Sequence, residues 1–281
     1  MEIVNKIDEL FVTRDGIRSR GGRLGLVPTM GALHEGHLSL IRAAKAKSDV
    51  VASSIFVNPT QFGPNEDFSR YPRDLEKDLA LLERDGVDLV FVPSVEEMYP
   101  QQSVTWVAVE GLSDRLCGKS RPGHFRGVAT VVAKLFNIVE PDIAFFGQKD
   151  AAQVAIIRRM VRDLNMPVAI EACPIVREPD GLALSSRNAY LSPEQRQDAL
   201  VLFRSLLRVR ELFADGERNP AILIKAAKNV LSGSSAVRLD YFEIVDPDEL
   251  TPLALINQPA LVAVAAFVGN TRLIDNIVLE P

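Results

Sequence analysis

The sequence of 281 residues is poor in histidine, cysteine and tryptophan, with three, two and one of each. The two cysteines, Cys117 and Cys173, cannot build the disulfide framework of a small secreted protein and form no CxxC motif. We therefore expect reduced thiols in a cytoplasmic protein. Long apolar runs are also missing. The longest, residues 260–268, is shorter than the roughly 20 residues that span a bilayer and predicts a buried strand. The N-terminus intersperses charges and lacks the apolar stretch of a signal peptide.

Neither sign of charge dominates. The chain has 32 Lys and Arg against 37 Asp and Glu, a net charge of −5, which argues against a broad nucleic-acid-binding face. We expect neither nucleic acid nor membrane as a partner. With 47% hydrophobic and 25% charged residues the composition excludes a disordered chain. The length suggests one large or two moderate domains.

The first two thirds of the chain alternate short β-branched runs with helical patterns. The predicted strands are residues 24–27, 50–57, 88–92, 104–109, 143–146 and 168–172, and the predicted helices are 36–46, 74–84, 127–139 and 153–164. Pro28 should end the first strand. Leu75, Leu79 and Leu82 form one apolar face of the second helix. The alternation predicts right-handed βαβ units, and so a Rossmann-like, doubly wound α/β fold with a mostly parallel sheet between two helical layers.

The pattern changes after Pro174. Ser192 as N-cap and Pro193 at the first position predict the start of a long helix. A second helix over 220–231 and three strands at 238–245, 261–268 and 272–279 should follow. We expect a catalytic domain over residues 1–175 and a smaller C-terminal α+β domain over residues 176–281, which acts as a lid.

Residues 27–37, VPTMGALHEGH, place a glycine loop between a strand and a helix. Backbone amides at a helix N-terminus favour phosphate, and His34 and His37 could donate hydrogen bonds as charge builds on a transferred phosphoryl group. The lack of a side chain at Gly36 would let a nucleotide approach the backbone. Zinc is an alternative, but zincin histidines are spaced i, i+4 and no third ligand is obvious. A pair of helix-capping histidines is the other alternative.

Three further segments carry polar chemistry where strands end or domains meet. Asn58 and Gln61 follow a strand, where uncharged amides can bind hydroxyls and carboxylates. Lys149 follows the 143–146 strand and could neutralise phosphate. Residues 184–187, LSSR, offer hydroxyls and a cation to a triphosphate. Each also has a plainer interpretation: a turn at Asn58, a solvated lysine and a serine-rich interdomain loop.

Residues 117–126, CGKSRPGHFR, concentrate positive charge in an acidic chain. The cluster consists of Lys119, Arg121, His124 and Arg126, together with two glycines. It could be an anion funnel or lid, or equally a solvated loop. The single Trp106 is expected in the core or at a dimer contact.

The HxGH string that opens the first predicted helix of the parallel domain resembles the HIGH signature of nucleotidyltransferases. Four segments in the same order resemble one family, the pantothenate synthetases (pantoate–β-alanine ligases). They are PTMGALHEGH, SIFVNPTQFGPNEDFSRYPR from Ser54, FGQKDAAQ from Phe146 and REPDGLALSSRN from Arg177. The resemblance covers essentially the whole chain.

The resemblance implies the ATP-dependent condensation of (R)-pantoate with β-alanine, through a pantoyl-adenylate, to pantothenate, AMP and pyrophosphate. It implies Mg²⁺ with the ATP, no metal held by the protein alone, and a homodimer. The implied catalytic residues are His37, His34 and Lys149. The implied ATP contacts are Met30, Gly31, Ala32, Leu33, His34, Glu35, Gly36, His37, Gly147, Gln148, Lys149, Asp150, Val176, Leu184, Ser185, Ser186 and Arg187. The implied contacts to pantoate and β-alanine are Gln61, Gln153 and Asn58.

Two residues depart from the family pattern, because Gln148 and Cys117 stand where the family commonly has Glu. Gln148 should matter little if its side chain points away from the nucleotide. Two other functions stay open: a different HIGH-type nucleotidyltransferase that releases its adenylyl or cytidylyl product, and a module that only binds ATP as a sensor.

Overall fold

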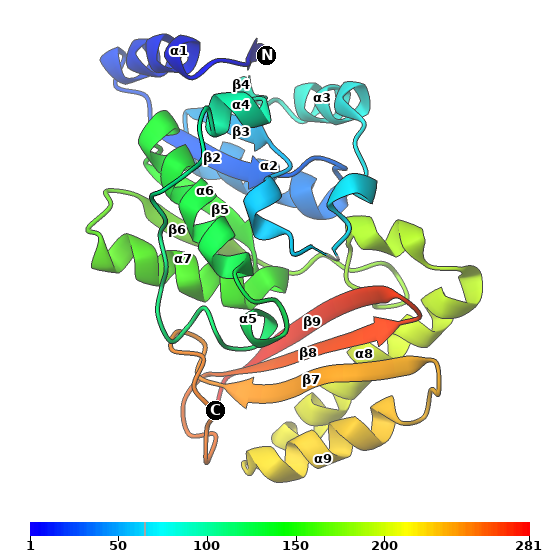
Figure 1. The fold of residues 1–281 in the computed structure, drawn as a ribbon. Coiled ribbons are helices and arrows are strands. Elements are labelled where there is room, and N and C mark those ends of the chain that lie inside the picture. The colour runs from blue at the N-terminus through cyan, green and yellow to red at the C-terminus, as the bar shows by residue number, and fades with distance from the viewer. Residues whose placement is uncertain (65) are drawn as a thin grey trace.

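A six-stranded parallel sheet forms the larger part of the molecule in the computed structural model, which describes residues 1–64 and 66–281 (Figure 1). The strand order is β1-β4-β3-β2-β5-β6. The strands are β1 (Glu2–Val4), β2 (Leu24–Thr29), β3 (Val50–Ile55), β4 (Leu89–Phe91), β5 (Ile143–Gly147) and β6 (Ala169–Cys173). Leaving β1 aside, the order reverses between β2 and β5, as in doubly wound folds. The predicted fold class is confirmed.

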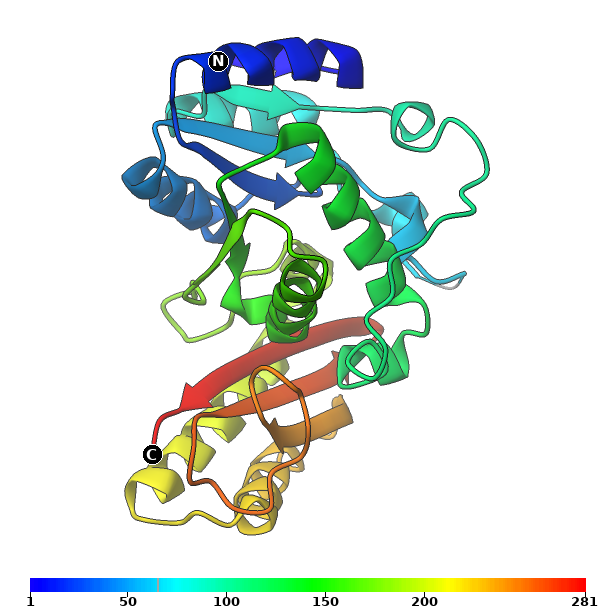
Figure 2. The ribbon, with the colours of Figure 1, turned by 90° about the vertical axis from the view of Figure 1, so that its left-hand side faces the viewer.

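Two layers of helices cover the sheet (Figure 2). The helices of this part are α1 (Ile7–Ser19), α2 (Glu35–Lys47), α3 (Leu75–Arg84), α4 (Val95–Met98), α5 (Cys117–Ser120), α6 (His124–Val139) and α7 (Ala151–Asp163). Because successive strand side chains point to opposite faces, Leu26 and Phe91 pack with α1, α6 and α7, whereas Val27 and Val90 pack with α2 and α3. No helix in the described part of the chain is long and apolar enough to cross a membrane.

The C-terminal part is a three-stranded antiparallel sheet of β7 (Val237–Val245), β8 (Ala260–Val268) and β9 (Thr271–Leu279), with α8 (Pro193–Ala214) and α9 (Pro220–Leu231) packed on it. The predicted start of α8 is confirmed, since Ser192 and Gln195 form a reciprocal capping box.

Strand β8 is apolar throughout because both of its faces are covered. Val262 and Val264 pack with α8 and α9, whereas Leu261 and Ala263 join the core that contains α6 and α7. The hydrophobic core therefore runs without a break from the parallel sheet into the C-terminal sheet, which lies directly below α7 in Figure 1.

Two strand predictions are wrong. The first strand does not end at Pro28 but continues to Thr29. Pro28 is tolerated because β5 pairs only with Gly25 and Leu26, so no hydrogen bond to β5 requires an N–H at position 28. Residues 104–109 form no regular element and belong to no sheet of the described chain, and Val104 is 91% exposed. High β-propensity does not make a strand where no neighbouring strand is available.

The expected apolar face of α3 is also only partly right. Leu82 is buried, but Leu75 is 46% exposed and the second buried residue of the helix is Asp78. The elements β1, α1, α4 and α5 were not anticipated from the sequence.

Candidate active site

The carboxyl ends of β3, β2, β5 and β6 converge on a cavity of about 230 Å³. This is the switch point of the strand order, where open α/β sheets bind ligands. The residues singled out from the sequence that line it are Met30, His34, Gly36, His37, Asn58, Gln61, Arg121, His124, Gly147, Lys149, Asp150, Gln153, Val176, Leu184, Ser185, Ser186 and Arg187. All three histidines of the chain thus meet at one cavity.

His34 and His37 cap the N-terminus of α2 reciprocally. The Nδ1 of His34 accepts a hydrogen bond from the backbone N–H of Gly36 at 3.1 Å, and the Nδ1 of His37 accepts one from the backbone N–H of His34 at 3.3 Å. The ring centroids lie 4.2 Å apart. The helix-capping interpretation is therefore correct, and it is compatible with a role in chemistry because capping uses only one nitrogen of each ring.

The capping bonds determine which nitrogen carries the proton. A nitrogen that accepts a hydrogen bond is unprotonated, so each neutral imidazole has its proton on Nε2. Burial and the Lys149 ammonium lower the pKa of His34 to about 4. Burial, followed by His34 and Lys149, lowers the pKa of His37 to about 3. Both rings are neutral at pH 7 and can donate one hydrogen bond each through Nε2.

The loop that leads into the histidines is held from behind by Asp78 of α3. Its carboxylate, 2% exposed, accepts hydrogen bonds from the backbone N–H groups of Ala32 and Leu33, both at 2.8 Å. Gly31 (φ +78°) and Ala32 (φ +50°) adopt the left-handed region there. Gly36 makes room for the His34 ring, since a Cβ would lie 2.9 Å from two of its atoms.

Asn58 and Gln61 form a buried amide pair after β3. The Nδ2 of Asn58 donates to the Oε1 of Gln61 at 3.1 Å and to the carbonyl of Gly127 at 3.2 Å, and its Oδ1 accepts from the Tyr99 hydroxyl at 2.9 Å. The side chain of Asn58 is therefore engaged within the protein. Gln61 in turn donates from Nε2 to the sulfur of Met30 at 3.0 Å, which is a weak acceptor that a ligand oxygen could replace.

The third histidine, His124, supports Gln61 from the backbone side. Its Nε2 lies 2.9 Å from the Nη1 of Arg121, which can only donate, so Nε2 accepts and Nδ1–H donates to the carbonyl of Gln61 at 2.8 Å. Burial and Arg121 lower the pKa of His124 to about 4. The two remaining nitrogens of Arg121 bind the carboxylate of Glu66 at 2.6 and 2.5 Å.

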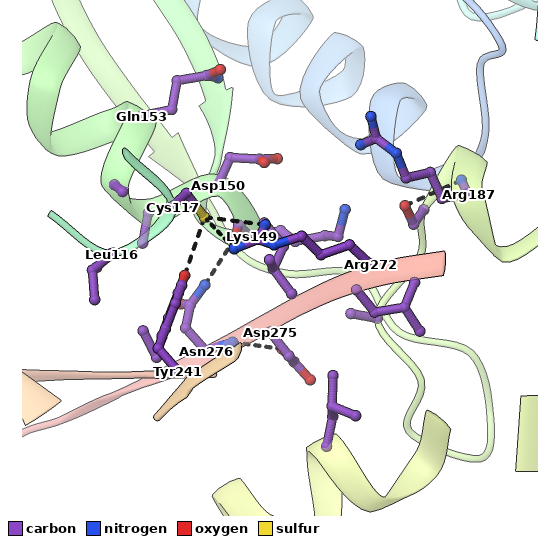
Figure 3. A pocket seen from close by; sticks show the side chains of 18 of the residues that line it. Leu116, Cys117, Lys149, Asp150, Gln153, Arg187, Tyr241, Arg272, Asp275 and Asn276 are labelled. Carbon is purple, nitrogen blue, oxygen red and sulfur yellow. Dashed lines mark hydrogen bonds between the residues drawn. The ribbon is translucent and has the colours of Figure 1, made fainter. Parts of the chain in front are cut away.

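Lys149, Asp150 and Gln153 lie where β5 passes into α7, between the large cavity and a smaller one of about 80 Å³ (Figure 3). They follow one another through η3 (Gln148–Asp150) and the first turn of α7. The side-chain amide of Gln153 forms no hydrogen bond to any other residue that the structure describes, so both its donors and its acceptor are available to a ligand.

The Ser185–Arg187 loop faces the histidines from the other side. Arg187 donates from Nε and Nη2 to the two carboxylate oxygens of Asp67 at 3.0 and 2.9 Å. The Tyr71 hydroxyl lies 3.3 Å from the Oγ of Ser186. A phosphate that binds Arg187 must therefore share the guanidinium with Asp67 or displace the Asp67 carboxylate.

Five of the expected ATP contacts do not line the cavity. Leu33 is in the core, Gly31 and Ala32 belong to the loop held by Asp78, and Glu35 pairs with Arg42 on the surface. The amide of Gln148 turns to Asn276 of β9 at 3.4 Å.

The basic cluster is likewise divided. Arg121 and His124 line the cavity, but Arg126 stacks on Trp106 at 4.7 Å and Lys119 is exposed. The thiol of Cys117 is buried, 3.1 Å from the Tyr241 hydroxyl and 3.7 Å from two nitrogens of Arg272. The four basic residues therefore do not act together as one anion-binding site.

The zinc alternative finds no support among the residues that the structure describes. Over residues 1–64 and 66–281, no three His, Cys, Asp or Glu side chains are grouped so that they could hold a metal ion.

Sequence reasoning missed three residues of the site: Asp67, Tyr71 and Asp78. Asp67 and Tyr71 lie within the SIFVNPTQFGPNEDFSRYPR segment, which could have pointed to them. Asp78 had one weak signal, a carboxylate one position before Leu79 on the supposed apolar face of a helix.

A neutral histidine pair at a helix N-terminus, opposite a lysine and at the switch point of a parallel sheet, is the arrangement of a nucleotide-binding α/β enzyme. The comparison with known families narrows that class. The chain belongs to the pantoate–β-alanine ligase family, whose model matches residues 2–278. It is 64% identical over 256 residues to the pantothenate synthetase of Acidobacterium capsulatum (91% of this chain, 86% of that one). It is 58% identical over 279 residues to that of Thermotoga neapolitana (99% and 100%).

Solved structures agree with this family over the whole chain. The pantothenate synthetase of Thermus thermophilus superposes with a TM-score of 0.95 at 50% identity, covering 100% of both chains. The pantoate–β-alanine ligase of Francisella tularensis, solved in complex with β-γ ATP and β-alanine, superposes with a TM-score of 0.81 at 36% identity, covering 99% of this chain and 97% of that one.

Proposed function

We propose that this protein condenses (R)-pantoate with β-alanine at the expense of ATP, giving pantothenate, AMP and pyrophosphate. One observation carries the proposal. His34 and His37 offer their Nε2–H donors at the same cavity that Lys149 and the side-chain amides of Gln61 and Gln153 line. Family membership and the ATP and β-alanine bound to the Francisella relative support the choice of substrates.

In the first step a carboxylate oxygen of pantoate attacks the α-phosphorus of ATP, and pyrophosphate leaves with the electrons of the broken P–O bond. Negative charge grows on the α-phosphoryl oxygens in the transition state, where hydrogen-bond donors aimed at them are most effective. His34 and His37 donate through Nε2 without losing a proton, while Lys149 and Ser185–Arg187 hold the phosphate chain.

In the second step the amine of β-alanine attacks the carbonyl of the pantoyl-adenylate, an amide bond forms, and AMP leaves. Gln61 and Gln153 hold pantoate through uncharged amides, which do not quench the nucleophilicity of its carboxylate. Asn58 acts indirectly, because its own polar atoms are bonded to Gln61, Gly127 and Tyr99.

Mg²⁺ fits this site as an ion carried by ATP. Such an ion takes most of its ligands from phosphate and water and needs only one or two carboxylates. Asp150 lines the cavity beside Lys149 and would provide one. When bound, the ion would neutralise phosphate charge.

Three further features belong to the proposal. Residues 1–175 form the catalytic domain, and residues 176–281 form a lid that carries the Ser185–Arg187 loop over the nucleotide. The exposed Val104 and Trp106 lie on an irregular segment that pairs with no strand in the described chain, and they form a homodimer contact. Two buried free thiols suit the reducing cytoplasm.

The experiment that tests the reaction measures pyrophosphate and AMP separately. With ATP and pantoate we expect one equivalent of pyrophosphate per site, and with β-alanine added we expect AMP and pantothenate in equal amounts. ATP binding without pantoate-dependent pyrophosphate would instead indicate a nucleotide sensor. Continuous pyrophosphate release with no AMP after β-alanine would indicate a nucleotidyltransferase that releases its product.

A further inference from the structure

Strand β9 carries two adjacent buried polar residues where it lines the smaller cavity of about 80 Å³, beside Lys149. Asp275 is 4% exposed and Asn276 is 2% exposed. Burying a carboxylate and an amide is unfavourable unless both are fully hydrogen-bonded. Their partners belong to two segments of the proposed ATP site, and Figure 3 shows the hydrogen bond from Asn276 to the first of them, at Lys149.

Asn276 binds the turn that carries Lys149. Its Nδ2 donates to the backbone carbonyls of Gln148 and Lys149, both at 2.9 Å. Its Oδ1 faces the Nε2 of Gln148 at 3.4 Å. The turn after β5 is therefore tied to a strand of the C-terminal sheet, 127 positions further along the chain.

Asp275 binds the segment that leads to Ser185–Arg187. Its two oxygens accept from Nη1 and Nη2 of Arg177 at 2.6 and 2.8 Å. Arg177 also donates to the carbonyl of Gly181 at 3.1 Å and lies over the ring of Phe203, 4.0 Å from its centroid. This bidentate pair holds the start of the loop whose end faces the cavity.

We propose that Asp275 and Asn276 are a positioning pair that sets the separation between the Lys149 turn and the Ser185–Arg187 loop. The C-terminal sheet is then a structural part of the triphosphate site as well as a cover over it. The inference rests on the proposed function, since it assigns Lys149 and Arg187 to the phosphates. A shift of about 1 Å in groups that orient a reacting substrate can cost about 100-fold in rate.

Asn276 is the residue to test because it can be weakened in steps. Asn276→Ser keeps one short donor and Asn276→Asp keeps none. We expect kcat/KM for ATP to fall about 10-fold in the first and about 100-fold in the second, with the KM for pantoate unchanged. A residue that only stabilises the fold would lower Tm and leave the KM for ATP as it is.

Asp240→Asn is the matched control. Asp240 lies in the same sheet, pairs with Arg272 at 2.7 Å and reaches the N-terminal part through Ser120 at 2.9 Å, but contacts neither phosphate segment. It should lower Tm without changing the KM for ATP. Arg177→Lys, which keeps the charge and loses the bidentate geometry, should raise the KM for ATP through the other segment.

A double-variant cycle decides whether Asn276 acts through Lys149. The loss of ATP affinity caused by Asn276→Ser, measured by calorimetry with ATP alone, should disappear in a Lys149→Ala background. Equal losses in both backgrounds would overturn the inference and leave the proposed function intact. If Lys149→Ala itself leaves ATP binding and adenylate formation unchanged, the role of Lys149 in the proposed function is refuted. Asn276 then cannot act on ATP through Lys149 either. The serine variant serves if the aspartate variant does not fold.

Discussion

At the residue scale, each imidazole of His34 and His37 uses Nδ1 to cap a helix and leaves Nε2 available as a hydrogen-bond donor. Nδ1 accepts a backbone hydrogen bond that begins α2, which leaves the proton on Nε2. A histidine pair held in this way can donate hydrogen bonds to a phosphoryl group while both rings remain neutral. Its donor geometry is determined by the helix cap, so the rings need no reorientation at the moment of reaction.

Substitutions at His37 can separate the capping role of Nδ1 from the donor role of Nε2. His37→Asn keeps an acceptor near the position of Nδ1 and removes the Nε2 donor, whereas His37→Ala removes both. We expect both variants to lose about 10²–10³-fold in the rate of adenylate formation. Only the alanine variant should also lose about 1 kcal/mol of unfolding free energy. Single-turnover assays with ATP and pantoate, and urea unfolding, measure the two effects. An asparagine variant with the wild-type rate would refute the role of Nε2.

At the element scale, the loop between β2 and α2 depends on a helix that contributes no side chain to the cavity. Asp78 of α3 holds two consecutive N–H groups of the loop, next to two residues with positive φ. Without that carboxylate the N–H groups of Ala32 and Leu33 would be unsatisfied in a buried place. The position of the histidine cap thus depends on the packing of α3 against α2.

Asp78→Asn tests this support, with Asp74→Asn on the same helix as its control. An asparagine at position 78 can accept from only one of the two N–H groups and turns its own donor toward the other. We expect a loss of about 1–3 kcal/mol in stability and about 10–100-fold in kcat/KM for ATP. Asp74 caps α3 through the backbone N–H of Lys77, a role that asparagine fills equally well. Steady-state kinetics with unchanged ATP use in the Asp78 variant would contradict the positioning role.

At the scale of the whole molecule, three neutral, half-buried histidines line one cavity, and one core joins the two sheets. Burial is the largest cause of the lowered pKa of His34, His37 and His124. The packing around the cavity therefore keeps these rings uncharged at neutral pH. The free energy of unfolding and the protonation state of these histidines therefore change with pH over the same range.

The pH dependence has a definite sign. In the unfolded chain each histidine binds a proton below a pH of about 6.5, whereas in the folded protein the pKa values are about 4, 3 and 4. The unfolded state binds more protons between these limits, so the stabilisation is complete above pH 6.5 and is lost as the pH falls toward 4. The slope should reach about 1.4 kcal/mol per pH unit for each histidine.

Denaturant unfolding at several pH values between 5 and 7 measures this slope. His124→Gln should reduce it by the share of one histidine. The comparison also separates the histidines from Asp78 and Asp275, whose pKa values are raised by burial and which act in the opposite direction. Equal slopes in the variant and the parent would show that His124 does not contribute.

Local sequence patterns are sufficient for the order of the main strands and helices and for two helix starts, although they do not reveal β1, α1, α4 or α5. Hydrophobic periodicity and capping residues act over a few positions, so the HEGH cap and the Ser192 capping box could be located without a fold. The four family segments located most of the residues that line the cavity in the same way, because each follows a strand whose end is visible in the sequence.

How those segments are held depends on tertiary contacts. Pro28 stays in its strand because the β5 side is unpaired there, and residues 104–109 form no strand because no partner lies beside them in the described chain. Asp78 reaches its loop across 46 positions and Asn276 reaches Gln148 across 128. No local pattern encodes such contacts, because a buried polar group is stable only where the fold brings its hydrogen-bond partner to it.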